Sequence, residues 1–80
     1  TEGQFDDLLA WQGGGCAICG TKEPGGRGSF HVDHCHTNGN IRGLLCHSCN
    51  VALGCFADDI ERINTAMNYL EKGGVYGFRG

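Results

Sequence analysis

The sequence has few basic side chains, no long apolar run and few of the large side chains that build a core. Lys and Arg together number 6 against 9 Asp and Glu, which gives a formal net charge of -3 over 80 residues. Non-specific attraction to nucleic acid comes from basic groups that neutralise phosphates. The sequence therefore does not predict strong autonomous DNA binding, and any activity on nucleic acid must be local or assisted by a partner.

The longest apolar stretch is too short to cross a membrane. It covers residues 51–57 and is interrupted by Gly54, whereas a spanning helix needs about 20 apolar residues. No basic segment followed by an apolar one marks a signal peptide, and the chain begins at Thr1 rather than Met. We therefore expect a soluble protein that does not act on a membrane, and we interpret the chain as a piece of a longer one.

The hydrophobic core predicted from the composition is too small to stabilise a fold alone. Only 21 residues carry large apolar side chains, while 15 glycines increase the entropy lost on folding. Natural domains of this size add disulfides, a metal ion or a partner chain. The length predicts a single domain, residues 1–80, and excludes a broad parallel sheet or a deep cofactor cleft.

Hydrophobic spacing predicts three helical segments and one hairpin. The expected elements are a helix over about residues 3–12, strands over 29–34 and 41–45, two helical turns over 50–56 and a helix over about 58–72. Asp58 and Glu61 form a cap-like pair at the start of the last helix. The core of the domain is expected at about residues 14–57.

Two C-x-x-C pairs stand 26 residues apart; they are Cys16 with Cys19 and Cys46 with Cys49. Four thiolates make a closed tetrahedral site that suits structural Zn²⁺. Such sites contribute about 10 to 16 kcal/mol in zinc-finger peptides, more than the expected stability of this chain. We therefore predict a zinc-stabilised domain, with two disulfides, a dithiol redox pair or an iron–sulfur centre as alternatives. Cys55 is interpreted as a small core residue, and Cys35 as a filler rather than a ligand.

A group of polar residues lies between and just after these pairs. The carboxylate of Asp33, at the end of the first strand, and the amide oxygen of Asn50, at the start of a helix, are hard ligands that suit Mg²⁺ or Mn²⁺. Neighbouring strand residues point to opposite faces, so His34 is separate from these ligands and can accept a proton from water near neutral pH. Four unrelated surface histidines within residues 31–47 are the alternative.

The run H-V-D-H-C-H-T-N-G-N-I-R-G-L-L-C-H-S-C-N-V-A-L-G, preceded by C-A-I-C-G, closely resembles the endonuclease VII-like branch of the HNH endonucleases. The likeness covers about residues 10–72. It implies a small α+β, zinc-stabilised domain with a ββα-metal (His-Me finger) fold and flanking N- and C-terminal helices. In that fold a hairpin and a helix hold one divalent cation beside a four-cysteine zinc.

Residue roles follow from this resemblance position by position. It implies that Asp33 and Asn50 hold the catalytic Mg²⁺ or Mn²⁺, that His34 is the general base and that the two C-x-x-C pairs bind zinc. His36 falls on a family histidine near the site and is expected to bind the cation or the scissile phosphate. Arg42 is assigned to DNA contact, although an exposed, solvated arginine is equally consistent with the sequence.

The predicted function is metal-dependent hydrolysis of DNA phosphodiester bonds, leaving 5′-phosphate and 3′-hydroxyl ends. Cys35 and Leu53 stand where relatives can have acidic residues, so fewer protein ligands are expected, and 80 residues cannot hold the dimerisation helices of junction-resolving relatives. Such modules often belong to larger phage or mobile-element proteins, which places this one in the cytoplasm of a bacterium or phage-infected host. The alternatives are a non-catalytic zinc module that binds nucleic acid or protein, and an enzyme acting on RNA or a single strand.

Overall fold

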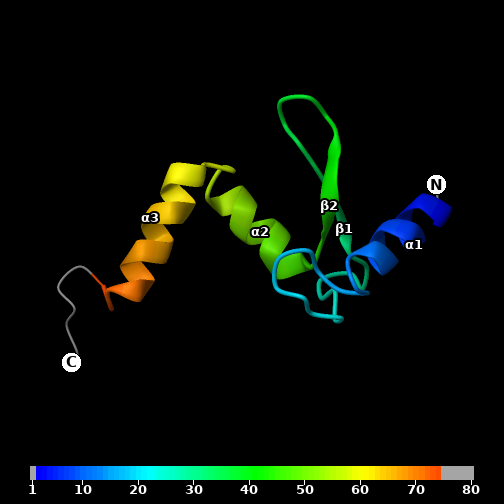
Figure 1. The fold of residues 1–80 in the computed structure, drawn as a ribbon, viewed down its shortest axis with the longest axis horizontal. Helices are drawn as coiled ribbons and strands as arrows, with labels where there is room; N and C mark the ends of the chain where they lie inside the picture. The colour runs from blue at the N-terminus through cyan, green and yellow to red at the C-terminus, as the bar shows by residue number, and fades with distance from the viewer. Residues whose placement is uncertain (1, 75–80) are drawn as a thin grey trace.

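The computed structural model describes residues 2–74 and shows a small α+β fold. Its elements, in chain order, are α1 (Glu2–Trp11), β1 (His31–His34), β2 (Ile41–Leu45), α2 (His47–Cys55) and α3 (Ile60–Glu71). Figure 1 shows the hairpin standing between α1 and α2, with α3 leading away from the rest. The expected three helices and one hairpin are therefore confirmed, with shifted boundaries.

The two strands form an antiparallel hairpin whose register changes at the end of β1. Asp33 lies opposite Gly43, but the next residue, His34, lies opposite Ile41. Arg42 is therefore an extra residue in β2, and such a bulge redirects a side chain out of the regular alternation. In a regular hairpin Arg42 would lie opposite His34 and on the same face of the sheet. The bulge instead places the Arg42 side chain on the face of Asp33.

The buried centre of the molecule is built as much from thiols as from hydrocarbon. Its buried hydrophobic residues are Cys16, Leu44, Leu45 and Cys46. Around three of them pack the partly buried side chains of Phe30, Cys49 and Leu53. So small an apolar centre agrees with the expectation that this chain needs a further source of stability.

Gln12 fastens the end of α1 to the hairpin. Its side-chain Oε1 accepts a hydrogen bond from the Leu44 N–H at 2.8 Å, and its Nε2 donates to the Leu44 carbonyl at 3.1 Å. The amide thus pairs with the backbone of β2 as a neighbouring strand would, because it offers one donor and one acceptor. This contact fixes α1 against the part of the sheet that leads into the second C-x-x-C pair.

The two later helices begin at other residues than the sequence predicted. α2 starts at His47, three residues before the expected Asn50, because Cys46 caps it: its Sγ accepts from the Cys49 N–H at 3.4 Å. α3 is capped by Asp59, whose carboxylate accepts from the Arg62 N–H at 3.2 Å. The prediction that Asp58 caps this helix was wrong, and so was the placement of Cys55 in the core, since Cys55 is exposed.

Among the described elements, none covers the apolar side chains of the last helix. Within residues 2–74, α3 makes no contact with any other helix or strand, and Ile60 and Leu70 are 81% and 75% exposed. The radius of gyration is 15.1 Å, against about 12 Å for a compact domain of this length. None of the described helices is long and apolar enough to span a membrane.

Candidate functional site

The four cysteines of the two C-x-x-C pairs converge on one point. Their sulfur atoms all lie within 4.8 Å of one another, and the four residues could hold a metal ion. The distance between the sulfurs of Cys19 and Cys46, one from each pair, is 3.7 Å. A tetrahedron with metal–sulfur bonds of about 2.3 Å has sulfurs about 3.8 Å apart. The cluster therefore fits a single tetrahedral Zn²⁺ in both ligand type and spacing.

Backbone hydrogen bonds shape the turns that carry these sulfurs. The Cys16 Sγ accepts from the Ile18 N–H at 3.4 Å, and the Cys16 N–H donates to the Thr21 carbonyl at 2.9 Å. Gly15, just before the first turn, has no room for a side chain, since a Cβ there would lie 2.5 Å from the Gly20 carbonyl oxygen. The first turn is thus closed tightly enough to preset two of the four ligands.

The thiols of the cluster differ in how readily they ionise. Burial opposes ionisation of Cys16, but backbone groups of Cys46 and of the first turn outweigh it and lower the pKa of Cys16 to about 6. Burial, followed by hydrogen bonds with the other thiols, raises the pKa of Cys49 to about 12. A cation that needs all four as thiolates must therefore displace protons.

Asp33 and Arg42 form the centre of a second polar site. The Arg42 Nε donates to Asp33 Oδ2 at 2.6 Å, and its Nη2 donates to Asp33 Oδ1 at 3.0 Å. The Asp33 side chain is only 13% exposed, and its hydrogen bond is the main cause that raises the pKa of Arg42 above its ordinary value. Arg42 is therefore exposed but paired with Asp33, and its assignment to DNA contact stays a prediction.

Asp58 joins the same group from the link between α2 and α3. Its Oδ2 accepts from Arg42 Nη2 at 3.1 Å and lies 3.1 Å from His36 Nδ1. Asp58 has a positive φ of 56°, as does the preceding Ala57 at 54°. The left-handed conformation of these two residues turns the carboxylate of Asp58 toward the hairpin rather than onto the first turn of α3.

The other predicted residues, His34 and Asn50, are not bonded to this group within residues 2–74. His34 is exposed, on the face of β1 opposite to that of Asp33, and Asn50 is partly buried in the first turn of α2. Among residues 2–74, no hydrogen bond joins the side chain of either one to Asp33 or Arg42. The structure thus brings Asp33, Arg42, His36 and Asp58 together, whereas the assignments of His34 and Asn50 stay predictions.

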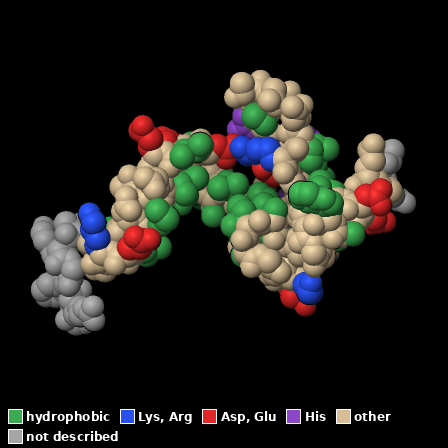
Figure 2. Space-filling view, viewed as in Figure 1, with side chains coloured by type: hydrophobic (Ala, Val, Ile, Leu, Met, Phe, Trp, Pro, Cys, Tyr) green, Lys and Arg blue, Asp and Glu red, His purple; other side chains and the backbone are tan. Residues whose placement is uncertain are grey.

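A shallow hollow of about 240 Å³ opens beside Asp33 and Arg42. It is lined by Ala17, Ile18, Asp33, Arg42, Gly43, Leu45 and Leu53, which come from the first cysteine turn, the hairpin and α2. In Figure 2, acidic, basic and histidine side chains gather between the hairpin and the neighbouring helix. The polar site therefore adjoins the cysteine cluster and is open to a surface ligand.

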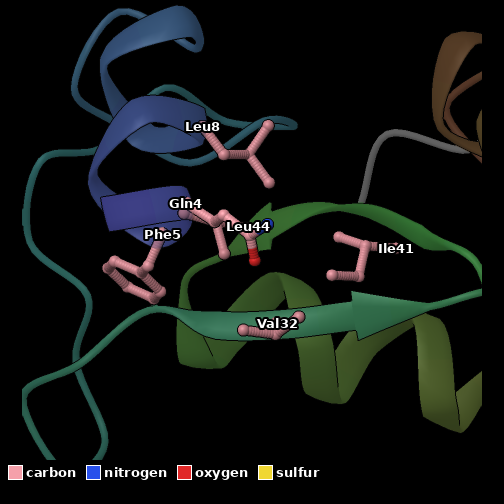
Figure 3. A pocket seen from close by; sticks show the side chains of 6 residues that line it. All are labelled: Gln4, Phe5, Leu8, Val32, Ile41 and Leu44. Atoms are coloured by element: carbon pink, nitrogen blue, oxygen red, sulfur yellow. The ribbon is translucent and has the colours of Figure 1, made fainter. Parts of the chain in front are cut away.

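A larger apolar cavity of about 440 Å³ lies on the other side of the hairpin. It is lined by Gln4, Phe5, Leu8, Val32, Ile41 and Leu44, and Figure 3 shows these side chains of α1 and of both strands around a common space. Among the described residues that line this cavity, none is acidic, basic or histidine. Asp33 and Arg42 thus lie on the α2 side of the hairpin, whereas His34 lies on the other face of β1, which is the face of Val32.

Comparison with known proteins decides the family. The family model for recombination endonuclease VII matches residues 1–72. The chain belongs to the recombination endonuclease VII family. This membership confirms the resemblance read from the cysteine and histidine motifs, and the family suggests a nuclease-related function.

Two relatives come from mycobacterial phages. The chain is 41% identical over 73 residues to the Gene 59 protein of Mycobacterium phage D29, covering 90% of this chain and 44% of that protein. It is 39% identical over 71 residues to the Gene 59 protein of Mycobacterium phage L5, covering 88% and 43%. The chain therefore spans less than half the length of either relative. No solved structure matches it.

Sequence reasoning missed two residues that organise these sites. Asp58 was assigned to helix capping, although the pair Asp58-Asp59 contains one more carboxylate than a single cap needs. Gln12 was counted only as the end of a helix, and nothing in the sequence indicates its bonds to Leu44. The surplus carboxylate was a usable signal, whereas the glutamine contact depends on the folded position of β2.

Proposed function

We propose that the chain is an HNH-type nuclease domain that hydrolyses DNA phosphodiester bonds with the help of a divalent cation. The observation that carries this proposal is the family match over residues 1–72. The order β1, β2, α2 supports a ββα-metal arrangement, and Asp33 lines the same hollow as Leu53 of α2. The four-cysteine zinc would be structural, because a closed tetrahedral site leaves no position for substrate.

Asp33 and Asn50 would hold the catalytic Mg²⁺ or Mn²⁺. A carboxylate and an amide oxygen are the hard donors these ions prefer, and the hollow beside Asp33 offers space for water and phosphate. Arg42 donates to both oxygens of Asp33, so a cation there would bind through the remaining lone pairs or after Arg42 has moved. The bound cation would supply Lewis-acid stabilisation of the charge that develops on the phosphate.

His34 would act as general base. Its imidazole accepts a proton from a water molecule, whose oxygen attacks phosphorus in line with the 3′ oxygen. The bond from phosphorus to that oxygen breaks, and the departing oxygen gains a proton to leave a 3′-hydroxyl beside a 5′-phosphate. His34 suits this role because its side chain is exposed and has no hydrogen-bond partner within residues 2–74.

Arg42 and His36 would contact the substrate phosphate. Arg42 places only Nε and Nη2 in bonds to carboxylates, so the N–H groups of Nη1 remain for an anionic oxygen. His36 is 79% exposed at its side chain, next to Asp58. The net charge of -3 supports the further proposal that a partner, or the rest of a longer phage protein, supplies DNA affinity in the cytoplasm of an infected host.

Plasmid nicking by the zinc-loaded protein tests this function. Cleavage is measured with Mg²⁺, Mn²⁺ or no added divalent ion, for the unmodified chain and for His34→Ala, Asn50→Ala and Asn64→Ala. We expect cation-dependent nicking that His34→Ala and Asn50→Ala abolish. Asn64, an exposed residue of α3, provides the matched control and should leave the rate unchanged.

Two outcomes would redirect the assignment. Cleavage that persists in a folded His34→Ala variant would contradict the base, and cleavage without any cation would contradict the roles of Asp33 and Asn50. No cleavage of duplex DNA, single-stranded DNA or RNA by the folded, zinc-loaded chain would favour a non-catalytic zinc module that binds nucleic acid or protein.

A further inference from the structure

Arg42 links two parts of the chain that are distant in sequence. Through Nε and Nη2 it donates two hydrogen bonds to Asp33 on β1, and through Nη2 it donates a third, at 3.1 Å, to Asp58 on the α2–α3 link. Its place in the β2 bulge makes this reach possible. The guanidinium thus bonds to two carboxylates, and its hydrogen bonds to Asp33 are shorter than its hydrogen bond to Asp58.

Arg42 opposes cation binding at Asp33 while both carboxylate oxygens accept from it. Each oxygen keeps a second lone pair that a cation could use, but the guanidinium would then place its positive charge close to that cation. The two carboxylates and one guanidinium carry a combined charge of -1, which does not exclude a divalent ion. Cation binding is therefore favoured when Arg42 moves away from Asp33 and keeps a charged partner elsewhere.

Asp58 offers such a place. Its Oδ2 already accepts from Arg42 and adjoins His36, whereas its Oδ1 has no hydrogen-bond partner within residues 2–74. The residue has a left-handed backbone, a conformation that Asp and Asn adopt more readily than other residues with a side chain. An aspartate in this conformation can receive a second guanidinium bond without rearranging the link.

We propose that Asp58 is a positioning residue that holds Arg42 when Asp33 binds a divalent cation. In this exchange the guanidinium leaves Asp33, pairs with both oxygens of Asp58 and stays beside the cation, where its remaining N–H groups face an incoming phosphate. The inference rests on the proposed role of Asp33 as a cation ligand. The new element is that Arg42 pairs mainly with Asp33 in the cation-free form and with Asp58 in the cation-bound form.

Mn²⁺ affinity in a double-mutant cycle tests the exchange. The zinc-loaded chain is titrated as wild type, Asp58→Asn, Arg42→Gln and the double variant; Asn keeps the left-handed conformation accessible. We expect Asp58→Asn to weaken Mn²⁺ binding by about tenfold, the size of one charged hydrogen bond. In the Arg42→Gln background the same substitution should change affinity by less than about twofold, because no guanidinium needs a second partner.

Control variants separate this proposal from the cation site itself. Glu61→Gln removes the same charge from an exposed position in α3 and should leave Mn²⁺ affinity unchanged. Asp33→Asn should abolish binding; Mn²⁺ binding that survives it would overturn the proposed site together with the exchange. Equal losses from Asp58→Asn in both backgrounds would overturn the exchange alone, because Asp58 would then act on the cation directly.

The NMR signal of the Arg42 Nε–H gives a readout that needs no catalysis. On saturation with Mg²⁺, the signal should shift while remaining protected from solvent in the wild type, since the guanidinium passes from one carboxylate to the other. In Asp58→Asn the protection should be lost under the same conditions. A signal that Mg²⁺ leaves unchanged in the wild type would mean that Arg42 stays on Asp33, which overturns the proposal.

Discussion

The cysteine-rich centre and α3 are kept folded by different means. In the centre, four sulfurs within 4.8 Å of one another join the first turn, the end of β2 and the start of α2. Within residues 2–74 no other helix or strand contacts α3, and the helix depends on its own hydrogen bonds and its Asp59 cap. The same chain thus contains one region held by long-range contacts and one held by local contacts.

This difference explains where the polar site is found. Asp33, Arg42 and Leu53 line one hollow beside the cysteine cluster, so their positions depend on the ligands that fix β2 and α2. Asp58 lies between the two regions, bonded to Arg42 on one side and preceding α3 on the other. Changes to the cluster should therefore disturb the site, whereas changes within α3 should leave it in place.

Loss of one zinc ligand should produce the largest effect. Cys46→Ser removes a sulfur that is both ligand and helix cap, and metal sites of this kind contribute about 10 to 16 kcal/mol to folding. We expect an unfolded chain without zinc, measured by circular dichroism and metal analysis. Cys55→Ser makes the same chemical change at an exposed cysteine and should leave both readouts unaltered. A folded, zinc-loaded Cys46→Ser protein would contradict the scaffold role of the cluster.

Acidification should weaken zinc binding. Because the pKa of Cys49 is raised to about 12, its thiol is protonated at neutral pH, and zinc must release that proton. Each proton released makes affinity rise by about tenfold per pH unit. The pKa of Cys16 is lowered to about 6 in the folded chain, so from that state zinc displaces a proton from this thiol only below about that pH. Calorimetric titrations at pH 6, 7 and 8 measure the slope, and a flat profile would show that binding releases no proton.

Removing equal side chains from the two regions should have unequal effects. Leu45→Ala truncates a side chain that is 3% exposed within the core cluster, which costs about 2–5 kcal/mol at buried sites. Leu70→Ala truncates one that is 75% exposed on α3 and should change stability by less than about 0.5 kcal/mol. Urea unfolding of the zinc-loaded variants provides the comparison. Similar losses would mean that α3 packs against the domain in solution.

The sequence predicted the parts of the fold that depend on local spacing. The C-x-x-C pairs identified the cluster because two ligands on one turn converge without help from distant residues, and Ile41–Leu45 was predicted with its observed boundaries. The capping of α2 was missed because a cysteine rarely serves as a helix cap. Here Cys46 lies between the last residue of β2 and the first residue of α2, and its Sγ caps that helix.

The candidate site was less predictable because its contacts depend on register. The β2 bulge is a one-residue shift between Asp33 and His34, and no turn residue in the sequence indicates it. Without it, Arg42 would lie opposite His34 and face away from Asp33. Asp58 was misassigned for a similar reason, since its left-handed backbone, not its position before a helix, decides which way its carboxylate points.

The smallest expected effect comes from removing the cap of α3. Asp59→Ala deletes the acceptor for the Arg62 N–H, and loss of such a cap costs about 1 kcal/mol of helix stability. Since α3 contacts no other described element, the loss should appear as reduced helicity and faster amide exchange over Ile60–Glu71 alone. Amide exchange and zinc affinity, measured on the same sample, separate the two regions. Faster exchange in α2 or weaker zinc binding would show that the two regions fold as one cooperative unit.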